Sequence, residues 1–300
     1  MSSLSIVVPR LGTHGIFEAT LASILRHRMP HHQVVVIQSD LQADTYGLED
    51  EIDFVEVAGR PGWAKYFNLI ESSVKHEAVN LIRPGIEVTQ HWFAQAIRHL
   101  QSERVGAVAC SLATAQHRDE IISCGLISNS SMIPGHATDW RQKPLGPCGW
   151  AGFYRRDVLK AIGPLDVTLS DEFAALDLAL SIRGLGLACE VVHDRVLSIA
   201  DAERLKLPVR QHTGRDAQRM VQRHVPRNEQ RIGSALATFA DLARGFWKPS
   251  RWTQVAGRFS AQSKQASDRA FRRQLDLARA ELENLAMSKA NGMSQQNSAA

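Results

Sequence analysis

The sequence lacks the features of a membrane-spanning or secreted protein. It contains no run of eighteen apolar residues, and its first residues, MSSLSIVVPRLG, have no basic segment followed by a long apolar one. The four cysteines include no C-x-x-C pair, which argues against a zinc site or a disulfide framework and favours ordinary half-buried thiols. They are Cys110, Cys124, Cys148 and Cys189. We therefore expect a soluble protein located in the cytoplasm.

Internal repeats and nucleic-acid-binding motifs are also absent, and the charge is unevenly distributed. Residues 201–300 carry 18 Lys and Arg against 9 Asp and Glu, whereas the whole chain has a formal net charge of +4, so the first 200 residues carry −5. An acidic first part does not suit a nucleic-acid surface. The basic second part suits phosphates, anionic lipid or another protein. We expect no nucleic-acid partner, because no aromatic platform accompanies this charge.

The 300 residues, of which 44% are hydrophobic, suffice for one sizeable core and an extension. Leu4 to Val8 and Val34 to Ile37 are apolar runs typical of buried strands, and Ile16 to Arg28 between them has helical spacing. This order predicts a βαβ unit with parallel strands. Ligands of such sheets bind at the carboxyl ends of the strands. Here these ends hold Pro9, Arg10, Gln38, Ser39 and Asp40.

The alternation of strands and helices continues along the chain. From Cys148 to Ile199 the sequence predicts a strand, a helix, a loop, a second helix and a last strand. Gly163 and Pro164 end the first of these helices. Before this stretch, strands are predicted over Ile52 to Val57, Ala78 to Ile82 and Val105 to Ser111, and helices over Trp63 to Lys75 and His91 to Leu100.

The stretch from Cys148 to Ile199 resembles the second half of a family 2 glycosyltransferase domain of GT-A fold. In that family a helix opening Arg-Arg leads to Gly-Gly-Phe-Asp, then to Glu-Asp-x-Asp-Leu, and then to a strand ending in His. The matching residues are Arg155-Arg156, Gly163-Pro164-Leu165-Asp166 and Asp177-Leu178. Ala174-Ala175 stand where the family has the Glu-Asp pair that supplies the catalytic base, and Ile199 stands where it often has a His near the metal.

The resemblance implies a fold and an activity. It implies a three-layer α/β sandwich of GT-A type, Rossmann-like, over residues 1–205, followed by a basic helical extension over residues 206–290. The implied activity is transfer of a sugar from a nucleotide-diphosphate sugar to a hydroxyl acceptor, in polysaccharide or glycoconjugate synthesis. A non-catalytic relative that binds nucleotide sugar or glycan, or that serves as a scaffold, is the alternative, because the residues of the family's chemistry are replaced.

The resemblance also assigns a nucleotide site. In the family, paired Asp residues after the second strand read the base; Gln38 and Ser39 take their place here and Asp40 is displaced. A glutamine amide still offers a donor and an acceptor to a base edge. Gly62 and Asn68 match the Gly and Asn that lie beside the diphosphate in the family. Arg60 and Lys65 are nearby cations, which either contact phosphate or are solvated surface charges.

The family's metal motif is altered at Arg83-Pro84-Gly85-Ile86-Glu87-Val88. Glycosyltransferases of this type have Asn-Pro-Asp-x-Glu-Val here and bind Mg²⁺ or Mn²⁺ against the diphosphate. Gly85 offers no carboxylate, so Glu87 alone predicts a poor metal site. Arg83 either neutralises the diphosphate in place of a metal or closes a turn over Glu87.

Base and acceptor residues are open to two interpretations each. Asp171 and Glu172 precede Ala174-Ala175 and are candidate replacement bases, although Asp171 also suits a helix cap. Asp177, one turn further on, matches a family position that organises the site. Trp140, Arg141 and Trp150 are either acceptor contacts or core residues.

The basic extension has helical patterns and no recognisable chemistry. Helices are predicted over Arg215 to His224 and Asn228 to Phe246, and Ala235 to Phe259 either lies on an anionic membrane or packs on its own domain. A later apolar stripe predicts a short coiled coil or dimer arm. Its members are Phe271, Leu275, Ala278, Leu282 and Leu285. Residues 291–300 are a polar tail that we expect to be disordered.

Overall fold

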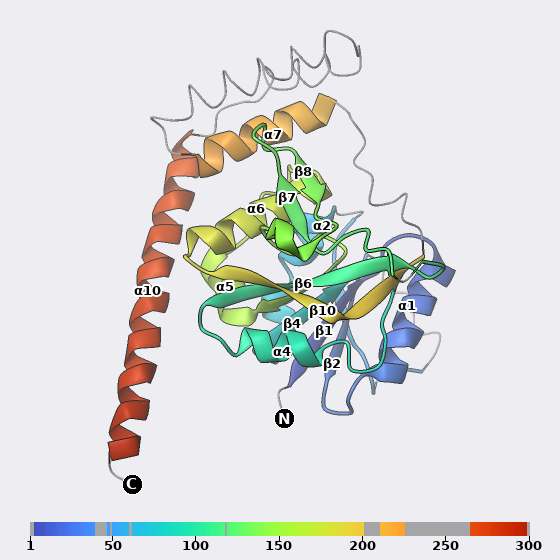
Figure 1. Cartoon of the computed structure of the whole chain (residues 1–300). Helices are drawn as coiled ribbons and strands as arrows, with labels where there is room; N and C mark the ends of the chain where they lie inside the picture. The colour runs from blue at the N-terminus through green and yellow to red at the C-terminus, as the bar shows by residue number, and fades with distance from the viewer. Residues whose placement is uncertain are drawn as a thin grey trace.

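The computed structural model describes residues 3–39, 47–48, 50–59, 62–117, 119–200, 211–225 and 265–298. Among these residues, eight strands form a central mixed sheet in the order β3-β2-β1-β4-β9-β6-β10-β5, with a separate hairpin β7-β8 (Figure 1). The strands are β1 (Leu4–Pro9), β2 (Gln33–Gln38), β3 (Asp53–Glu56), β4 (Ala78–Ile82), β5 (Ile86–Glu87), β6 (Val105–Thr114), β7 (Leu126–Ser128), β8 (Pro134–His136), β9 (Ala151–Arg155) and β10 (Ala188–Ile199).

Helices cover both faces of this sheet. They are α1 (His14–His27), α2 (Trp63–Phe67), α3 (Ile70–Ser73), α4 (Ala94–Leu100), α5 (Arg156–Ile162), α6 (Asp171–Gly184), α7 (Gln211–His224) and α10 (Gln265–Ser298), with a 3₁₀ turn at Trp140–Gln142. In Figure 1, α4 lies below the sheet and α6 lies above it, so the sheet is the middle layer of three. The predicted three-layer α/β sandwich is therefore confirmed.

The parallel strands bring three carboxyl ends to one edge of the sheet. β1 pairs in parallel with β2 and with β4, with Val7 opposite both Val35 and Leu81. The βαβ unit predicted from the apolar runs is thus confirmed, and each run is buried on both faces because helices lie above and below. The residues that follow these strands, Arg10, Ser39 and Arg83, consequently share an edge.

The strand β9 runs antiparallel between β4 and β6, and a buried amide fixes it there. The Asn80 side chain on β4 has no exposed surface. Its Nδ2 donates to Gly152 O at 3.0 Å, and Trp92 Nε1 donates to its Oδ1 at 2.9 Å. Both ends of the amide are satisfied, so the centre of the sheet has a single arrangement. The backbone position of Arg83, one residue beyond β4, follows from it.

The stretch Trp63 to Lys75, predicted as one helix, is divided into α2 and α3. The N–H of Leu69 donates to Tyr66 O, three residues back, so the chain tightens between the two short helices. The side chain of Asn68 turns outward at this point and bonds to the backbone of Leu165 in both directions, at 3.1 and 2.8 Å. This tertiary contact is not visible in a local pattern.

The cysteines are free thiols, and three of them, Cys110, Cys124 and Cys148, are buried. Burial raises the pKa of Cys124 to about 11 and that of Cys189 to about 12. Protonated thiols in the core are poor nucleophiles and poor metal ligands. The burial and the raised pKa values of these thiols agree with the structural role that the cysteine spacing predicted.

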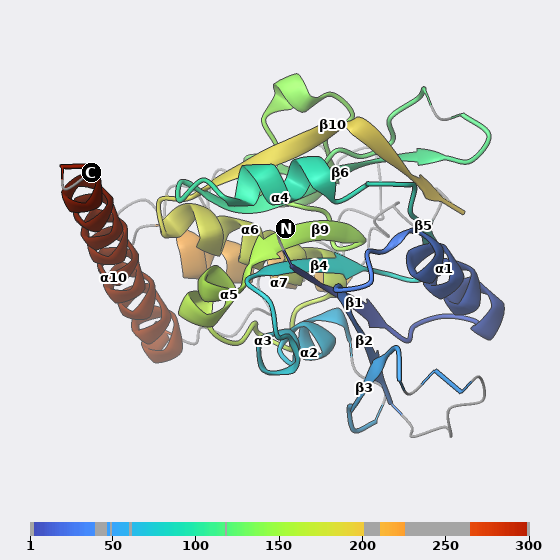
Figure 2. The same cartoon turned by 90° about the horizontal axis from the view of Figure 1, so that it is seen from below.

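The described part of the basic extension packs on the sheet domain. The helix predicted over Arg215 to His224 is confirmed as α7, which crosses above α6, and α10 descends beside α5 (Figures 1 and 2). Phe271, Leu275 and Ala278 of the apolar stripe are buried in this chain's own core. Residues 291–298, expected to be a disordered tail, continue α10, because extending a formed helix requires no new nucleation.

Several predictions about the extension fall on residues outside the described ranges. They include the boundary near residue 205, the helix over 228–246 and the amphipathic segment over 235–259. Within the described ranges, no helix has the length and apolar character needed to cross a membrane.

Candidate functional site

A polar cavity of about 420 Å³ lies at the carboxyl ends of β1 and β2. Its lining residues are Arg10, Gly12, Thr13, His14, Phe17, Gln38 and Ser39. Arg10 Nη1 donates to Gln38 Oε1 at 3.0 Å, and the Arg10 guanidinium lies 5.4 Å from the centre of the Phe17 ring. The site offers an amide, a cation and an aromatic face. These are groups that recognise a flat polar ring.

The residues predicted at this edge differ in what they do. Gln38 is 2% exposed and lines the cavity. Its predicted role is recognition of the nucleotide base. Pro9 is buried as the last residue of β1 and positions Arg10, whose N–H donates to Ile37 O at 2.8 Å. Asp40 and Arg60 lie outside the described residues.

Residues around α2, expected beside a diphosphate, contact the chain itself. Lys65 Nζ donates to Ala58 O at 2.9 Å, and the Asn68 amide is bonded to Leu165 as described above. Gly62 precedes α2 and leaves room for the carboxylate of Asp171, whose Oδ1 would lie 3.4 Å from a Cβ at this position. The backbone N–H of Trp63, the first residue of α2, donates to Asp171 Oδ1 at 2.9 Å.

Arg83 lies at the end of β4 and is fixed on two sides. Its guanidinium lies 4.7 Å from the centre of the Trp150 ring, and its Nη2 lies 3.2 Å from Asp171 Oδ2. Its N–H donates to Trp150 O at 2.8 Å. The turn toward Glu87 is closed by the backbone, with Ile86 N–H donating to Arg83 O at 3.2 Å. One of the two roles predicted for Arg83 was to close this turn over Glu87. The backbone closes the turn, and the Arg83 side chain contacts Trp150 and Asp171 instead.

Asp171 is the first residue of α6, but it does not cap that helix. Ser170 stands at the N-cap position and makes no side-chain cap. One oxygen of Asp171 instead caps α2 and the other pairs with Arg83. The cap predicted for Asp171 thus belongs to a different helix. This carboxylate joins the end of β4 to the starts of α2 and α6.

Glu172 lies beside this pair and has an unusual environment. Burial raises the pKa of its carboxyl group, the charge of Asp171 raises it further, and its own backbone N–H and the charge of Arg83 oppose the rise. Ala174 and Ala175, which stand in the place of an acidic pair, are 0% and 2% exposed. Both alanines belong to the hydrophobic core of the domain, so they are packed among apolar side chains. Among the described residues on α6, Asp171 and Glu172 are the carboxylates near the Arg83 end of β4.

Asp177 has no exposed surface. Its Oδ1 lies 2.9 Å from Arg223 Nε and 2.6 Å from His224 Nε2, both at the end of α7. The aromatic ring of Phe271 from α10 lies 3.5 Å from the Arg223 guanidinium. A ligand at the sheet edge does not reach this carboxylate, so the structure supports an anchoring role for Asp177.

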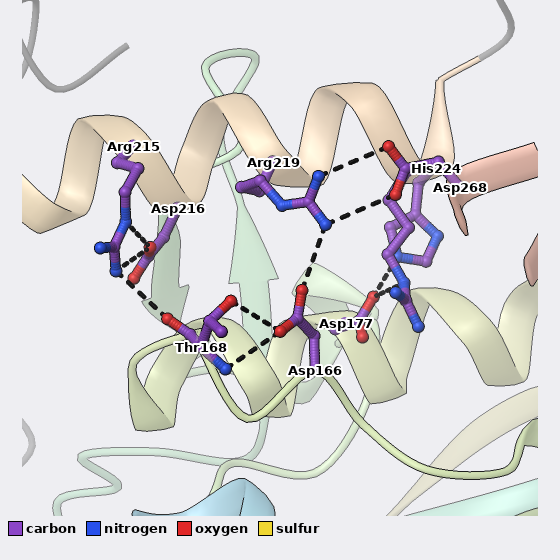
Figure 3. Close-up of polar contacts among 9 residues, drawn as sticks. Asp166, Thr168, Asp177, Arg215, Asp216, Arg219, His224 and Asp268 are labelled. Carbon is purple, nitrogen blue, oxygen red and sulfur yellow. Dashed lines mark hydrogen bonds and ion pairs between the residues drawn. The ribbon is translucent and has the colours of Figure 1, made fainter. Parts of the chain in front are cut away.

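The side chains of α7 that hold the loop before α6 were not singled out from the sequence (Figure 3). Asp216 Oδ2 accepts from Ser170 N at 3.0 Å and from Ser170 Oγ at 2.8 Å. Arg219 lies 3.1 Å from Asp166 and 3.4 Å from Asp268 on α10. The available signal is a spacing of four between Arg215, Arg219 and Arg223, which places three cations on one helix face.

Comparison with solved structures finds chains of similar structure. A mannosyltransferase from Pyrobaculum calidifontis, determined with GDP-Man and Mn²⁺, is similar over 92% of this chain and 85% of its own, with 18% identity and a TM-score of 0.52. GalNAc-T7, determined with UDP, GalNAc and Mn²⁺, is similar over 74% of this chain and 48% of its own, with 12% identity and a TM-score of 0.57. TarS from S. aureus is similar over 93% of this chain and 53% of its own, with 13% identity and a TM-score of 0.55.

The fold is of the GT-A type. This chain spans about half the length of GalNAc-T7 and of TarS, and identities this low establish the fold alone. No protein-family model matches the sequence, and no curated protein matches it.

The described residues do not fit a divalent metal such as the Mn²⁺ with which the mannosyltransferase and GalNAc-T7 were determined. Glu87 lies exposed on the short strand β5, opposite Ser198. Gly85 has no side chain, and its carbonyl accepts from Ala200 N–H at 2.9 Å. No group of three His, Cys, Asp or Glu residues in the described ranges has the geometry of a metal site. One exposed carboxylate supplies too few oxygens for Mg²⁺ or Mn²⁺.

The two tryptophans predicted as acceptor contacts lie in different places. Trp150 is 8% exposed beneath Arg83, whereas Trp140 is 53% exposed. Trp140 stands at a cavity of about 560 Å³ along the start of β10, with the ring of His193 at 5.1 Å and the guanidinium of Arg141 at 5.1 Å. Trp150 thus supports a cation, and Trp140 is the one that a ligand can reach.

The anchoring role of Asp177 can be tested by stability. Asp177→Asn should cost about 3 kcal/mol of unfolding free energy, because it leaves the buried guanidinium of Arg223 without its counter-charge. Urea unfolding measures this loss. The control Asp276→Asn, at an exposed position on α10, should change stability by less than about 0.5 kcal/mol. Equal stability of Asp177→Asn and the wild type would contradict the anchoring role.

The environment of Glu172 predicts a pH dependence of stability. Because the pKa of the Glu172 carboxyl group is raised in the folded chain, the folded chain keeps this proton at pH values just above 4.5. The unfolded chain, with the ordinary pKa of 4.5, releases it there. Stability is therefore lost as the pH rises from 4.5 through the folded pKa. Glu172→Gln cannot ionise, so its stability relative to the wild type should increase over that window and then stay constant, as measured by urea unfolding at several pH values.

A carboxylate with the opposite shift provides the control. Hydrogen bonds from Lys75 and from Gln33 lower the pKa of Asp53 below its ordinary value of 3.8. Asp53→Asn should therefore lose stability relative to the wild type as the pH rises. A difference between Glu172→Gln and the wild type that is independent of pH would show that Glu172 is not desolvated.

Proposed function

We propose that this protein is a glycosyltransferase that takes its sugar from a nucleoside-diphosphate donor bound at the carboxyl ends of β1, β2 and β4. The observation that carries the proposal is the position of Arg83. It places a fixed cation at the sheet edge where ligands of α/β folds bind, on the same edge as the polar cavity of Arg10 and Gln38. The mannosyltransferase and GalNAc-T7, which share the fold, were determined with GDP-Man and with UDP.

The cavity between Arg10 and Gln38 is the proposed site of the nucleoside. The Gln38 amide presents a donor and an acceptor to the base edge, and its Oε1 is held by Arg10 at 3.0 Å. Asp40 follows Gln38 by two positions in the sequence, and we assign it to the same nucleoside site on that basis. The cavity of about 420 Å³ is within the usual range for a small ligand.

Arg83 is the proposed counter-ion of the donor diphosphate. A guanidinium binds phosphate oxygens in a bidentate way and needs no metal to do so. Lys65 is exposed on α2, and it remains assigned to the same role, together with Arg60, by its position in the sequence. Asn68 holds the loop at Leu165 and acts on the donor only by fixing the chain around α2. Glu87 was predicted as a metal ligand from its sequence position, and the proposal assigns it no part in donor binding.

The proposed transfer needs one carboxylate at the acceptor hydroxyl. The hydroxyl oxygen attacks the anomeric carbon, the bond to the diphosphate oxygen breaks, and the hydroxyl proton passes to the carboxylate. The nucleoside diphosphate leaves with the bonding electron pair, and Arg83 offsets its charge. Asp171 and Glu172 are the candidate bases. The proposed acceptor is a polysaccharide or glycoconjugate, and Trp140 remains a candidate acceptor contact by its exposure and its sequence position.

A non-catalytic role is the second candidate, and a specific observation favours it. Ala174 and Ala175 are buried in apolar packing, and Asp177 is bound by Arg223 and His224. Those positions thus supply no base. In this case the chain binds nucleotide sugar or glycan, or a partner glycosyltransferase, without turnover. Release of the sugar from a bound donor, with and without acceptor, distinguishes the two candidates.

Membership of glycosyltransferase family 2 and the cellular setting are proposals of the same kind. The first is supported by the ungapped match over Arg155-Arg156 and Asp177-Leu178. A cytoplasmic location and contact with the inner face of a membrane are supported by composition. Pairing of two chains through α10 is supported by the exposed Leu277, Leu285 and Met287, since the first part of the stripe already packs in this chain.

Calorimetric binding of UDP, GDP and their common sugars, in EDTA and in Mn²⁺, tests the donor site. At least one nucleotide should bind equally well in both buffers, because Arg83 supplies the positive charge. Arg83→Ala should weaken that binding about tenfold or more, the usual effect of losing a hydrogen bond to a charged group.

Arg28→Ala is the matched control. Arg28 has the same exposed fraction of 15% and also pairs with a carboxylate, Glu51, at the other end of α1 from the cavity. It should leave nucleotide binding within about twofold of the wild type. Absence of binding to every nucleotide, or binding that requires Mn²⁺ and ignores Arg83, would refute the proposal.

A further inference from the structure

We infer that Asp171 competes with the donor diphosphate for Arg83, and that donor binding displaces its carboxylate. The inference rests on the proposed function and names a residue that controls affinity at that site. Asp171 Oδ2 lies 3.2 Å from Arg83 Nη2, and Asp171 Oδ1 accepts from Trp63 N–H at 2.9 Å. Carboxylate and phosphate bind guanidinium through the same two-oxygen geometry, so the two anions exclude each other.

The exposure of the pair permits this exchange. Arg83 and Asp171 have side chains that are 15% and 33% exposed, whereas the carboxylate of Asp177 is fully buried. A ligand can therefore reach the Arg83–Asp171 pair without unfolding α6. An ion pair at this level of exposure is also weak enough to be replaced, because water screens it.

The surroundings of the pair hold Arg83 in place when Asp171 leaves. The guanidinium is supported by the ring of Trp150 at 4.7 Å, and the Arg83 N–H is bonded to Trp150 O. On the other side, Asp216 holds both the N–H and the hydroxyl of Ser170, the residue before Asp171. The backbone on both sides is thus fixed, and displacement requires rotation of the Asp171 side chain, which also gives up the hydrogen bond from Trp63 N–H.

The exchange has a consequence for the transfer step. In the donor-free protein, Asp171 neutralises Arg83 and is not available as a base. Once the diphosphate takes its place, the carboxylate is released beside the donor, next to Glu172 at the start of α6. Donor binding thereby frees a base where the proposed transfer needs one. The same exchange lowers donor affinity, because each binding event breaks an ion pair.

Asp171→Asn separates the charge of this residue from its hydrogen bond. The amide oxygen still accepts from Trp63 N–H, while the negative charge that neutralises Arg83 is removed. Calorimetry in EDTA would measure binding of inorganic pyrophosphate, UDP and GDP to the wild type and to the variant. Pyrophosphate, and whichever nucleotide binds the wild type, should bind Asp171→Asn about three- to fivefold more tightly.

Two further variants isolate the cause. Asp53→Asn removes one negative charge from an exposed pair with Lys75, so it controls for net charge and should change affinity less than about twofold. In the background of Arg83→Ala, the change at Asp171 should bring no gain, because the competition occurs at Arg83. If Asp171→Asn does not fold, as judged by circular dichroism, Asp171→Ser keeps a cap acceptor and should give the same increase.

The outcomes distinguish this inference from the proposed function. A wild type that binds nucleotide and an Asp171→Asn that binds it no more tightly would overturn the inference and leave the donor site intact. A gain in pyrophosphate affinity without nucleotide binding to either protein would support the inference and refute the proposed function. A gain that persists without Arg83 would also overturn the inference.

Discussion

The carboxylate of Asp171 is the contact on which the arrangement of this edge depends. One oxygen receives the first N–H of α2, and the other pairs with the guanidinium at the end of β4. Three segments that are distant in sequence meet at a single side chain of α6. The parallel strands bring their carboxyl ends together at this edge, and the contact with Asp171 holds the Arg83 guanidinium there in a fixed position.

The helix α7 determines where that side chain lies. Asp216 accepts two hydrogen bonds from Ser170. Arg219 joins Asp166 to Asp268 of α10, and Asp177 anchors the far end of α7 (Figure 3). These pairs are buried, so each partner is costly to remove, and together they fix the loop before α6. The basic extension is therefore part of the candidate site through its described helices. These described helices position the loop, and none of their residues lines the cavity of Arg10 and Gln38.

Local patterns predicted the elements of the fold because they depend on nearby residues. The apolar runs at Leu4 to Val8 and Ala78 to Ile82 identify β1 and β4, and Gly163 ends α5 as expected. The contacts of the candidate site could not be predicted from local patterns, because they join residues that are distant in the sequence. Arg83 and Asp171 are 88 positions apart, and Asn68 meets Leu165 across the fold. Sequence position assigned Asp177 to the site, whereas the arginine and histidine of α7 place it in the interior.

A structure of the protein determined with a nucleoside diphosphate in the presence of EDTA tests the central claim most directly. The account predicts diphosphate oxygens within hydrogen-bonding distance of the Arg83 guanidinium, which remains stacked on Trp150, and an Asp171 carboxylate turned away from it. A diphosphate bound elsewhere, or a bound diphosphate with the Arg83–Asp171 pair still intact, would contradict the account.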